Sequence, residues 1–268
     1  MNPILLDLGV IKIYWYSVTM FLAMFVGILL FYKSAKKSGL SDDFIVNLLF
    51  YGIIFGLIGA RLYYVFFNLS YYVNNPIEII EVWNGGLAIH GGLIGGFLWF
   101  VYYSRKNKVS LLKLLDMACV SVIIGQAIGR WGNFFNGEAH GGIVSREILE
   151  KRLIPSFIIN GMNIDGEYFE PTFLYESLWN VLGFIILVVV RKKYKVKDGV
   201  LTGIYLVWYS LIRFFIEGMR TDSLMLGSIR VARLVSLLLF ITGLFLIFYR
   251  RKDTRINRYK ERNIKNEI

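Results

Sequence analysis

The fold is decided by residues 111–138, which read LLKLLDMACVSVIIGQAIGRWGNFFNGE. An apolar run from Leu111 to Ile128 ends in a stretch that carries a cation, amides and a carboxylate. The run is long enough to cross a bilayer, which takes about 20 residues. Because an ionisable side chain at membrane depth costs free energy, Arg130 marks a functional site by default. Asn133, three residues on, shares its helix face. The alternative to a functional site is a helix end followed by a turn, at which the Arg130 side chain extends to the membrane–water interface.

Composition places the chain in a membrane. Of its 268 residues, 56% are hydrophobic and 16% aromatic, whereas soluble domains are about 45–50% apolar. One cysteine and two histidines leave no disulfide framework and no metal site with several Cys or His ligands, so we expect no metal and no cofactor. The net charge of +11 is interpreted as a signal of membrane orientation, and no nucleic-acid partner is expected.

Seven apolar segments are each long enough to span a bilayer. The sequence therefore predicts an all-α integral membrane protein with a single polytopic membrane domain over residues 1–268. The predicted spans are 14–32, 45–67, 87–103, 111–134, 172–190, 200–219 and 229–249. Between the fourth and fifth spans, residues 136–171 are predicted to form a small folded cap, and residues 250–268 form a basic tail.

The positions of the cations predict the orientation. Lysine and arginine follow the first, third, fifth and seventh spans, whereas the segment between the second and third carries Glu78 and Glu81 but no Lys or Arg. By the positive-inside rule, the N-terminus lies outside and the C-terminus lies in the cytoplasm. The cap is then extracytoplasmic.

This orientation brings polar side chains from six spans to the outer half of the membrane. They are Tyr16, Arg61, His90, Arg130, Tyr175, Glu176, Tyr209, Arg213, Glu217 and Arg220. The last four have the spacing i, i+4, i+8 and i+11, which predicts one stripe of a helix. Asp116, near the cytoplasmic end of its span, is predicted to be structural.

Glycines accompany two of these spans. The small residues from Gly52 to Ala60 predict close packing of two helices. The six glycines around His90 predict, in addition, backbone that lies close to a bound group.

A nest of Arg130, Arg213 and Arg61 suits a phosphate, because the guanidinium fork matches phosphate with two hydrogen bonds. The nearest anion at that depth is a phospholipid headgroup. The sequence has no P-loop and no G-x-S-x-G elbow. Cys119, deep in apolar sequence, is interpreted as a core residue, since a buried thiol is inert. The nucleophile is therefore expected to arrive with a second substrate.

Six motifs resemble one known family along nearly the whole chain. They are Trp15-Tyr16, Gly59-Ala60-Arg61-Leu62-x-Tyr64, Trp83-x-Gly85-Gly86-x-x-x-His90-Gly91-Gly92, Gly129-Arg130-x-Gly132-Asn133-Phe134-x-Asn136-Gly137-Glu138, Pro171-Thr172-x-x-Tyr175-Glu176 and Tyr209-x-x-x-Arg213-Phe214-x-x-Glu217-x-x-Arg220. Their order and content resemble bacterial prolipoprotein diacylglyceryl transferases. The chain departs from that pattern at Glu170 and Phe173.

The resemblance implies a seven-span enzyme of the bacterial cytoplasmic membrane whose site faces outward. Such enzymes move a diacylglyceryl group from phosphatidylglycerol to the lipobox cysteine of a preprolipoprotein and release glycerol 1-phosphate. The implied partners are phosphatidylglycerol, the signal peptide of the preprolipoprotein and membrane lipids.

The polar residues of the outer membrane half and the family resemblance together suggest a role for each residue. Arg130 and Arg213 are predicted to hold the departing phosphate. His90 is the candidate base, because imidazole exchanges protons near neutral pH; the alternative is a packing or hydrogen-bonding role. Tyr209 completes the predicted catalytic set, although it and Tyr16 also fit as interfacial aromatics. The predicted substrate-binding residues are Tyr16, Arg61, Asn133, Glu138, Gly141, Glu217 and Arg220.

Other classes of membrane protein fit less well. The main alternative is a secondary transporter or a binder of an anionic solute or lipid headgroup. Transporters commonly show repeated halves with broken spans in corresponding positions, and no such repeat is present in the sequence. A retinal protein needs a lysine in its last span, and residues 229–249 contain none. A scaffold without chemistry has no need of so many intramembrane charges.

Overall fold

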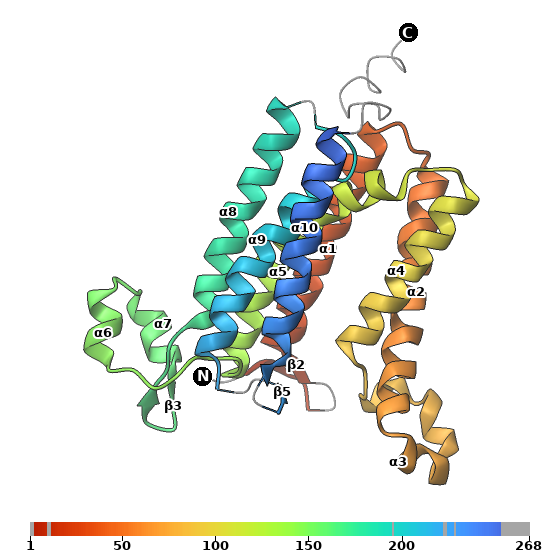
Figure 1. The fold of residues 1–268 in the computed structure, drawn as a ribbon. Coiled ribbons are helices and arrows are strands. Elements are labelled where there is room, and N and C mark those ends of the chain that lie inside the picture. Colours follow the sequence, from red (N-terminus) through yellow and green to blue (C-terminus); the bar gives the residue numbers. More distant parts are fainter. Residues whose placement is uncertain (1–2, 10–11, 195, 222–223, 228, 253–268) are drawn as a thin grey trace. The chain divides into compact units, whose positions relative to one another are not determined.

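Helices dominate the structure (Figure 1), a computed structural model that describes residues 3–9, 12–194, 196–221, 224–227 and 229–252. The long helices are α1 (Trp15–Lys37), α2 (Asp42–Phe67), α4 (Ile89–Lys106), α5 (Leu111–Asn136), α8 (Thr172–Lys193), α9 (Val200–Met219) and α10 (Val231–Lys252). The short helices are α3 (Leu69–Asn74), η1 (Pro76–Ile80), η2 (Val82–Asn84), α6 (Arg146–Lys151) and α7 (Ser156–Gly161). The strands form three antiparallel hairpins, β1 (Ile4–Asp7) with β2 (Lys12–Tyr14), β3 (Asn163–Ile164) with β4 (Glu167–Tyr168), and β5 (Met225–Leu226) with β6 (Ile229–Arg230). The predicted all-α class is confirmed.

Six helices within the described residues are long and apolar enough to cross a membrane, namely α1, α2, α5, α8, α9 and α10. The chain is therefore a multi-pass membrane protein. The predicted third span, 87–103, does form a helix, but α4 is not among those six. It begins at Ile89, after Gly85 and Gly86, whose φ values of 88° and 68° are incompatible with a helix. The seven-span count and the orientation stay predictions.

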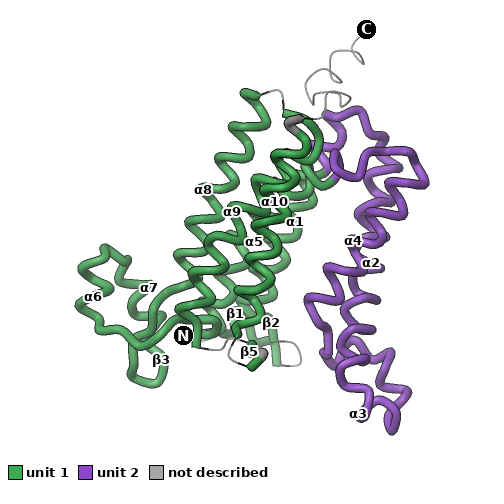
Figure 2. Tube along the Cα trace, viewed as in Figure 1, with its two compact units in different colours: residues 1–31, 115–268 green, residues 32–114 purple. Residues whose placement is uncertain are grey.

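The helices belong to two compact units (Figure 2), and each is described by itself. Unit 1 is Met1–Phe31 with Leu115–Ile268, and unit 2 is Tyr32–Leu114. The single membrane domain inferred from the sequence stays a prediction. Most of the predicted basic tail, residues 253–268, lies outside the described residues.

In unit 1, small and aromatic residues join three spans. The indole rings of Trp179 in α8 and Trp208 in α9 stack at 4.3 Å, and each Nε1 donates to the other residue's carbonyl oxygen at 3.0 Å. Helices α9 and α10 meet at Gly203 and Gly243, where an added Cβ would lie 2.8 and 2.7 Å from the opposing carbonyl oxygen. Only glycine allows the two backbones to come this close.

Polar residues of α5 have structural roles near the start of that helix. Asp116 accepts hydrogen bonds from Gly199 N and Thr202 N, each at 2.8 Å, and from Thr202 Oγ1 at 2.6 Å. Its carboxylate therefore satisfies amides at the start of α9 that have no partner inside the helix. The predicted structural role of Asp116 is confirmed. Cys119 is buried, as predicted, in a cluster with Val120 and Leu201.

At the other end of unit 1, the segment between α5 and α8 folds against these helices. It holds α6, α7 and the β3–β4 hairpin. Ile158 and Met162 pack with Phe134 of α5 and with Phe173 of α8 in one buried cluster. We call this segment, residues 137–171, the cap. Its packing fixes the position of the polypeptide that follows the arginine-bearing end of α5.

In unit 2, α2 and α4 pack through glycines. An added Cβ on Gly59 would collide with the carbonyl oxygen of Gly91, and one on Gly95 would collide with that of Phe55. The predicted close packing of the Gly52–Ala60 segment is confirmed. At Gly91 and Gly95 the close packing of the two helices is sufficient to explain why the residue is glycine. The prediction that these glycines lie close to a bound group is therefore not needed at these two positions.

Candidate functional site

A buried carboxylate joins the two arginines that the sequence singles out. Glu176 lies in the first turns of α8 and is 3% exposed. Its Oε2 forms an ion pair with Arg130 Nε from α5, and its Oε1 lies 3.4 Å from Arg213 Nη1 of α9. Three helices thus place two guanidinium groups around one carboxylate. The predicted meeting of Arg130 and Arg213 is confirmed.

The arginine of α9 has a second acidic partner. Arg213 Nη2 lies 2.8 Å from Oε2 of Glu217, one turn further along the helix, and Glu217 is 2% exposed. Arg230, at the end of β6, donates through Nη1 to the backbone carbonyl of Glu217. Burial of these charges is tolerated because each has a partner. Glu217 thus pairs with an arginine of its own helix, and its role at the site stays a prediction.

The arginine of α5 has a polar partner on its own helix. Arg130 Nη1 donates to Asn133 Oδ1 at 3.4 Å, and Asn133 Nδ2 donates to Glu138 Oε1 at 3.0 Å. Glu138 N also donates to the carbonyl oxygen of Asn133 at 3.0 Å, which closes the turn after α5. Among the described residues, Glu138 is thus linked to Arg130 through Asn133. Arg130 Nη2 is left as a donor for a ligand, as far as the described part of the chain shows.

Two tyrosines lie close to this site in sequence or packing, one on α1 and one on α9. An added Cβ on Gly132 would be 2.9 Å from Cδ2 of Tyr16, so the Tyr16 ring of α1 lies against α5 one residue before Asn133. Tyr209 is on α9, one turn before Arg213, and its ring stacks on that of Tyr205 at 5.9 Å. Both rings are partly accessible.

The cap is joined to the end of α9 at Gly141. Gly141 and Arg220 form an antiparallel bridge, and Gly141 N donates to the carbonyl oxygen of Glu170 at 2.9 Å. Arg220 is the C-terminal cap of α9, with φ −71° and ψ 143°, so the chain leaves the helical path after this residue. Tyr209, Arg213 and Glu217 lie within α9 and Arg220 caps it, and the prediction that all four share one polar stripe stays a prediction. The chain must turn at Arg220 to pair with the cap.

A second arginine–carboxylate contact fastens the cap to α8. Arg152 Nη1 lies 2.6 and 2.8 Å from the two carboxylate oxygens of Glu170 and donates to the Tyr175 hydroxyl at 3.3 Å. The hydrogen bonds to Tyr175 and Glu170 raise the pKa of Arg152. Glu170 is one of the two residues where the chain departs from the family pattern, and here it accepts hydrogen bonds from Arg152 and Tyr175.

In unit 2, His90 lies in the first turn of α4. Its imidazole is exposed, and its ring centre lies 6.1 Å from that of Tyr63 in α2. The backbone just before it is held to α2, because Ala88 N donates to the carbonyl oxygen of Ala60 at 3.1 Å. Since unit 2 is described by itself, the predicted position of His90 beside the arginines stays a prediction.

Arg61 organises the loop that leads to His90. Its Nε donates to Ile79 O at 2.8 Å, and its Nη1 donates to Gly85 O at 2.8 Å and Gly86 O at 3.0 Å. Its Nη2 donates to the carbonyl oxygens of Glu78 and Glu81. All five N–H groups of the guanidinium thus have backbone partners, and Arg61 is 6% exposed. These hydrogen bonds hold the loop in place. That Arg61 also contacts the substrate stays a prediction.

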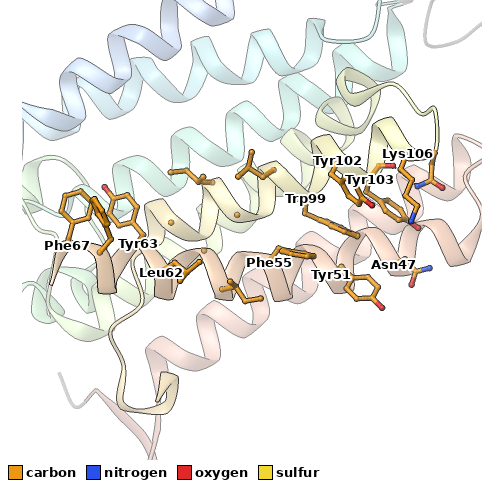
Figure 3. Close-up of a pocket in the computed structure, with 18 residues that line it drawn as sticks. Asn47, Tyr51, Phe55, Leu62, Tyr63, Phe67, Trp99, Tyr102, Tyr103 and Lys106 are labelled. Carbon is orange, nitrogen blue, oxygen red and sulfur yellow. The ribbon is translucent and has the colours of Figure 1, made fainter. Parts of the chain in front are cut away.

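An apolar groove of about 1510 Å³ runs along α2 and α4. Figure 3 shows the side chains that line it. Aromatic rings line it, including Phe55 and Trp99, which stack at 4.9 Å. Gly91, next to His90, lines one part of the groove, and Lys106 lines another.

Sequence comparison identifies the relatives of this chain. The model of one protein family, described as prolipoprotein diacylglyceryl transferase, matches residues 3–249. The chain belongs to this family. A protein from Staphylococcus xylosus named phosphatidylglycerol–prolipoprotein diacylglyceryl transferase is 49% identical over 261 residues, which cover 97% of this chain and 93% of the relative. Relatives of the same name from Staphylococcus aureus (strain MSSA476) and Listeria innocua are each 50% identical over 251 residues. Those alignments cover 93% and 94% of this chain and 89% and 90% of the relatives.

Within this member of the prolipoprotein diacylglyceryl transferase family, most of the predicted site residues of unit 1 do lie together. Arg130, Asn133, Glu138, Arg213 and Glu217 are linked by the hydrogen bonds and ion pairs above. The others are attached differently, Tyr16 through Gly132, Tyr209 through its place on α9, and Gly141 and Arg220 through the bridge between cap and helix.

One residue at the centre of this diacylglyceryl transferase site was not among the predicted site residues. This residue is Glu176. The sequence places it among the polar side chains of the outer membrane half but does not assign it a role. The available signal was the same that identified Arg130, an ionisable group within an apolar segment. Arg230 is also absent from the predicted site residues. It follows a segment without helical or strand periodicity, and its partner is a backbone carbonyl, which the sequence does not reveal.

Proposed function

We propose that this chain transfers the diacylglyceryl group of phosphatidylglycerol to the thiol of the lipobox cysteine in a preprolipoprotein, the first step of bacterial lipoprotein maturation. The thiolate sulfur forms a bond to the glycerol carbon that carries the phosphoester, and the bond from that carbon to oxygen breaks. The products are a thioether-linked lipid and glycerol 1-phosphate. The thiol proton passes to a base.

The observation that carries this proposal is the convergence of Arg130 and Arg213 on one buried carboxylate, in a chain half identical to transferases of that name. A phosphate that leaves as a monoester gains negative charge, and preorganised donors at that position lower the barrier. Arginine matches phosphate with two parallel hydrogen bonds. The site contains the cations that this leaving group requires.

The acidic residues of the site orient these cations. Glu176 and Glu217 hold two nitrogens of Arg213, so its guanidinium plane is fixed before substrate binds. Glu176 and Asn133 do the same for Arg130. Orientation in advance matters because donors that need no reorganisation stabilise a transition state most. In the proposed reaction, Arg130 and Arg213 hold the phosphate and the carboxylates act through them.

The remaining predicted residues take the other tasks of the reaction. His90 is the proposed base for the thiol proton, with Arg61 holding the loop in front of it. Tyr16 and Tyr209 orient the headgroup. Arg220 and Gly141 keep the cap against the end of α9. The thiol comes from the signal peptide, since Cys119 is buried away from the arginines in its own cluster.

The proposed location is the bacterial cytoplasmic membrane, with the arginine site and cap on the outer side. The support is the positive-inside rule applied to the basic ends of α1, α4 and α8. Single cysteines at Lys37, Lys106 and Lys192, in a Cys119→Ser background, should resist an impermeant thiol reagent in intact cells. A cysteine at Glu167 in the cap should react. Labelling of the first three sites would overturn the orientation.

A direct assay tests the reaction. Purified protein in detergent is incubated with phosphatidylglycerol and a lipobox peptide, and mass spectrometry measures the peptide and the released glycerol phosphate. We expect a peptide heavier by one diacylglyceryl group and an equal amount of glycerol phosphate. A peptide with serine in place of the lipobox cysteine is the control. Binding of lipid and peptide without an adduct would reject the transferase and favour a headgroup-binding protein.

A further inference from the structure

The cap exposes apolar side chains on its outer side. Ile148 in α6, Leu153 in the following turn and Phe157 in α7 are 41%, 89% and 59% exposed. We call these three residues the cap rim. The inner faces of the same short helices are also apolar, with Leu149 and Ile158 fully buried. A helix between a core and water normally has a polar outer face, so the packing of the cap does not account for the rim.

The backbone at Leu153 strengthens this point. Its φ of 57° lies in the left-handed region, where helix ends usually place glycine or asparagine. The turn is well formed, since Leu153 N donates to Glu150 O at 2.9 Å and Ile154 N donates to Leu149 O at 3.2 Å. A leucine at this position adds backbone strain and buries little apolar surface within the chain. Its side chain is therefore suited to a contact outside the chain.

The rim continues the exposed apolar surface of a candidate span. Arg152, the neighbour of Leu153, is bonded to Tyr175 at the start of α8. Leu178, three residues on and therefore on the same face of α8, is 60% exposed, and α8 is one of the candidate spans. In Figure 1, α6 and α7 lie to the left of the lower end of α8. The apolar outer surface of the span thus leads directly to the rim.

Charge next to the rim fits the same environment. Lys151, the last residue of α6, is exposed and lies two positions before Leu153. Short helices that lie in a bilayer interface combine apolar side chains with basic residues that meet lipid phosphates. The cap combines apolar side chains with charges of both signs, since α6 also carries Glu147 and Glu150, and it lies beside the start of the candidate span α8.

We propose that the cap rim inserts into the headgroup region of the bilayer leaflet next to it, so that the cap is a membrane-bound element. This goes beyond the proposed transfer reaction and does not depend on it. The buried side of α7 packs on Phe134 and Phe173, which belong to the helices of Arg130 and Glu176. Membrane contact at the rim therefore holds the cap over the arginine site at the depth of lipid headgroups.

Fluorescence from single labels tests this proposal. In a Cys119→Ser background, which removes the only cysteine, the variants Leu153→Cys and Phe157→Cys are labelled with an environment-sensitive dye. The matched control is Glu167→Cys, an exposed position on the β3–β4 hairpin of the same cap. The proteins are reconstituted in phosphatidylglycerol–phosphatidylcholine vesicles with and without lipids that carry a nitroxide near the headgroup. Unchanged unfolding temperatures establish that all three variants fold.

We expect blue-shifted emission and strong nitroxide quenching at positions 153 and 157, and little of either at 167. Equal quenching at all three positions, or none at 153 and 157, would overturn the proposal. Quenching that is lost when a lipobox peptide is added, or a blue shift that appears only with that peptide, would also overturn it and assign the rim to peptide binding.

Discussion

Glu176 of α8 forms an ion pair with Arg130 of α5 at the end of unit 1 where the cap packs on these helices. Glu176 Oε1 also lies 3.4 Å from Arg213 Nη1, so one carboxylate sets the orientation of both proposed phosphate ligands. A bound phosphate then meets two guanidinium groups whose planes are already fixed. We therefore expect Glu176 to act as a positioning residue, with a measurable effect on catalysis.

Replacing Glu176 with glutamine should reduce turnover while the protein remains folded. The amide keeps the size of the side chain but removes the charge that both arginines share. We expect kcat to fall by about 10- to 100-fold, as is typical when a group that orients a ligand is lost. The control is Glu150→Gln, which breaks an exposed pair with Arg146 worth at most about 1 kcal/mol. Equal kcat in both variants would contradict a positioning role.

Lysine in place of Arg130 or Arg213 should not support activity, although the charge is kept. Lysine offers a point charge on a flexible stem, whereas the arginine fork makes two bonds in a fixed plane. Loss of one transition-state donor lowers the rate by about 10²–10³-fold, or some 3–4 kcal/mol. The measurement is the rate of glycerol phosphate release, with Arg146→Lys in the cap as the control. Near wild-type rates in folded Lys variants would rule out the bidentate contact.

His90→Gln should lower activity at neutral pH, with partial recovery as the pH rises. Glutamine forms hydrogen bonds but does not take up a proton, so the variant depends on thiol that has already ionised. Thiol ionisation increases toward about pH 8.5, and the deficit relative to wild type should narrow in the same direction. The pH–rate profile of both proteins checks this. Full activity of His90→Gln at neutral pH would leave His90 with a packing role beside Tyr63.

Gly141→Ala should destabilise the cap, whereas Gly142→Ala should not. An added Cβ on Gly141 would lie 2.6 Å from Cβ of Glu170, while one on Gly142 has no atom within 4 Å. Crowding of this kind costs about 1–3 kcal/mol. Limited proteolysis within the cap should therefore be faster for the first variant, and activity lower. Equal protease sensitivity of the neighbouring variants would show that the bridge to Arg220 does not require glycine.

Arg61→Lys should loosen the loop before His90. Lysine has three N–H donors where arginine has five, so at least two of the backbone carbonyls now bonded to Arg61 lose their partner. Hydrogen bonds from charged donors contribute about 1.5–3 kcal/mol each, and the local stability should fall by on the order of 3 kcal/mol. Hydrogen exchange of residues 76–88 measures the effect, with the exposed Arg105→Lys as the control. Unchanged exchange would assign Arg61 to another task.

Much of this protein follows from local sequence. The apolar runs determine the membrane class, because length and hydropathy suffice to recognise a span. The charges at Arg130, Arg213 and Glu217 stand out for the same reason, and the spacing of the last two predicts their contact within one helix. Asp116 and Cys119 were also interpreted correctly from their surroundings.

Only the tertiary structure decided which groups meet between helices. That Glu176 binds Arg130 depends on how α5 and α8 are rotated and packed, and no periodicity along either segment encodes that rotation. Arg61 shows the same limit, since its acceptors are backbone carbonyls, which are alike at every residue and leave no mark in the sequence. The sequence determined which charged side chains lie within apolar segments. The packing of helices that are distant in the sequence determined which partner offsets the desolvation cost of each buried charge.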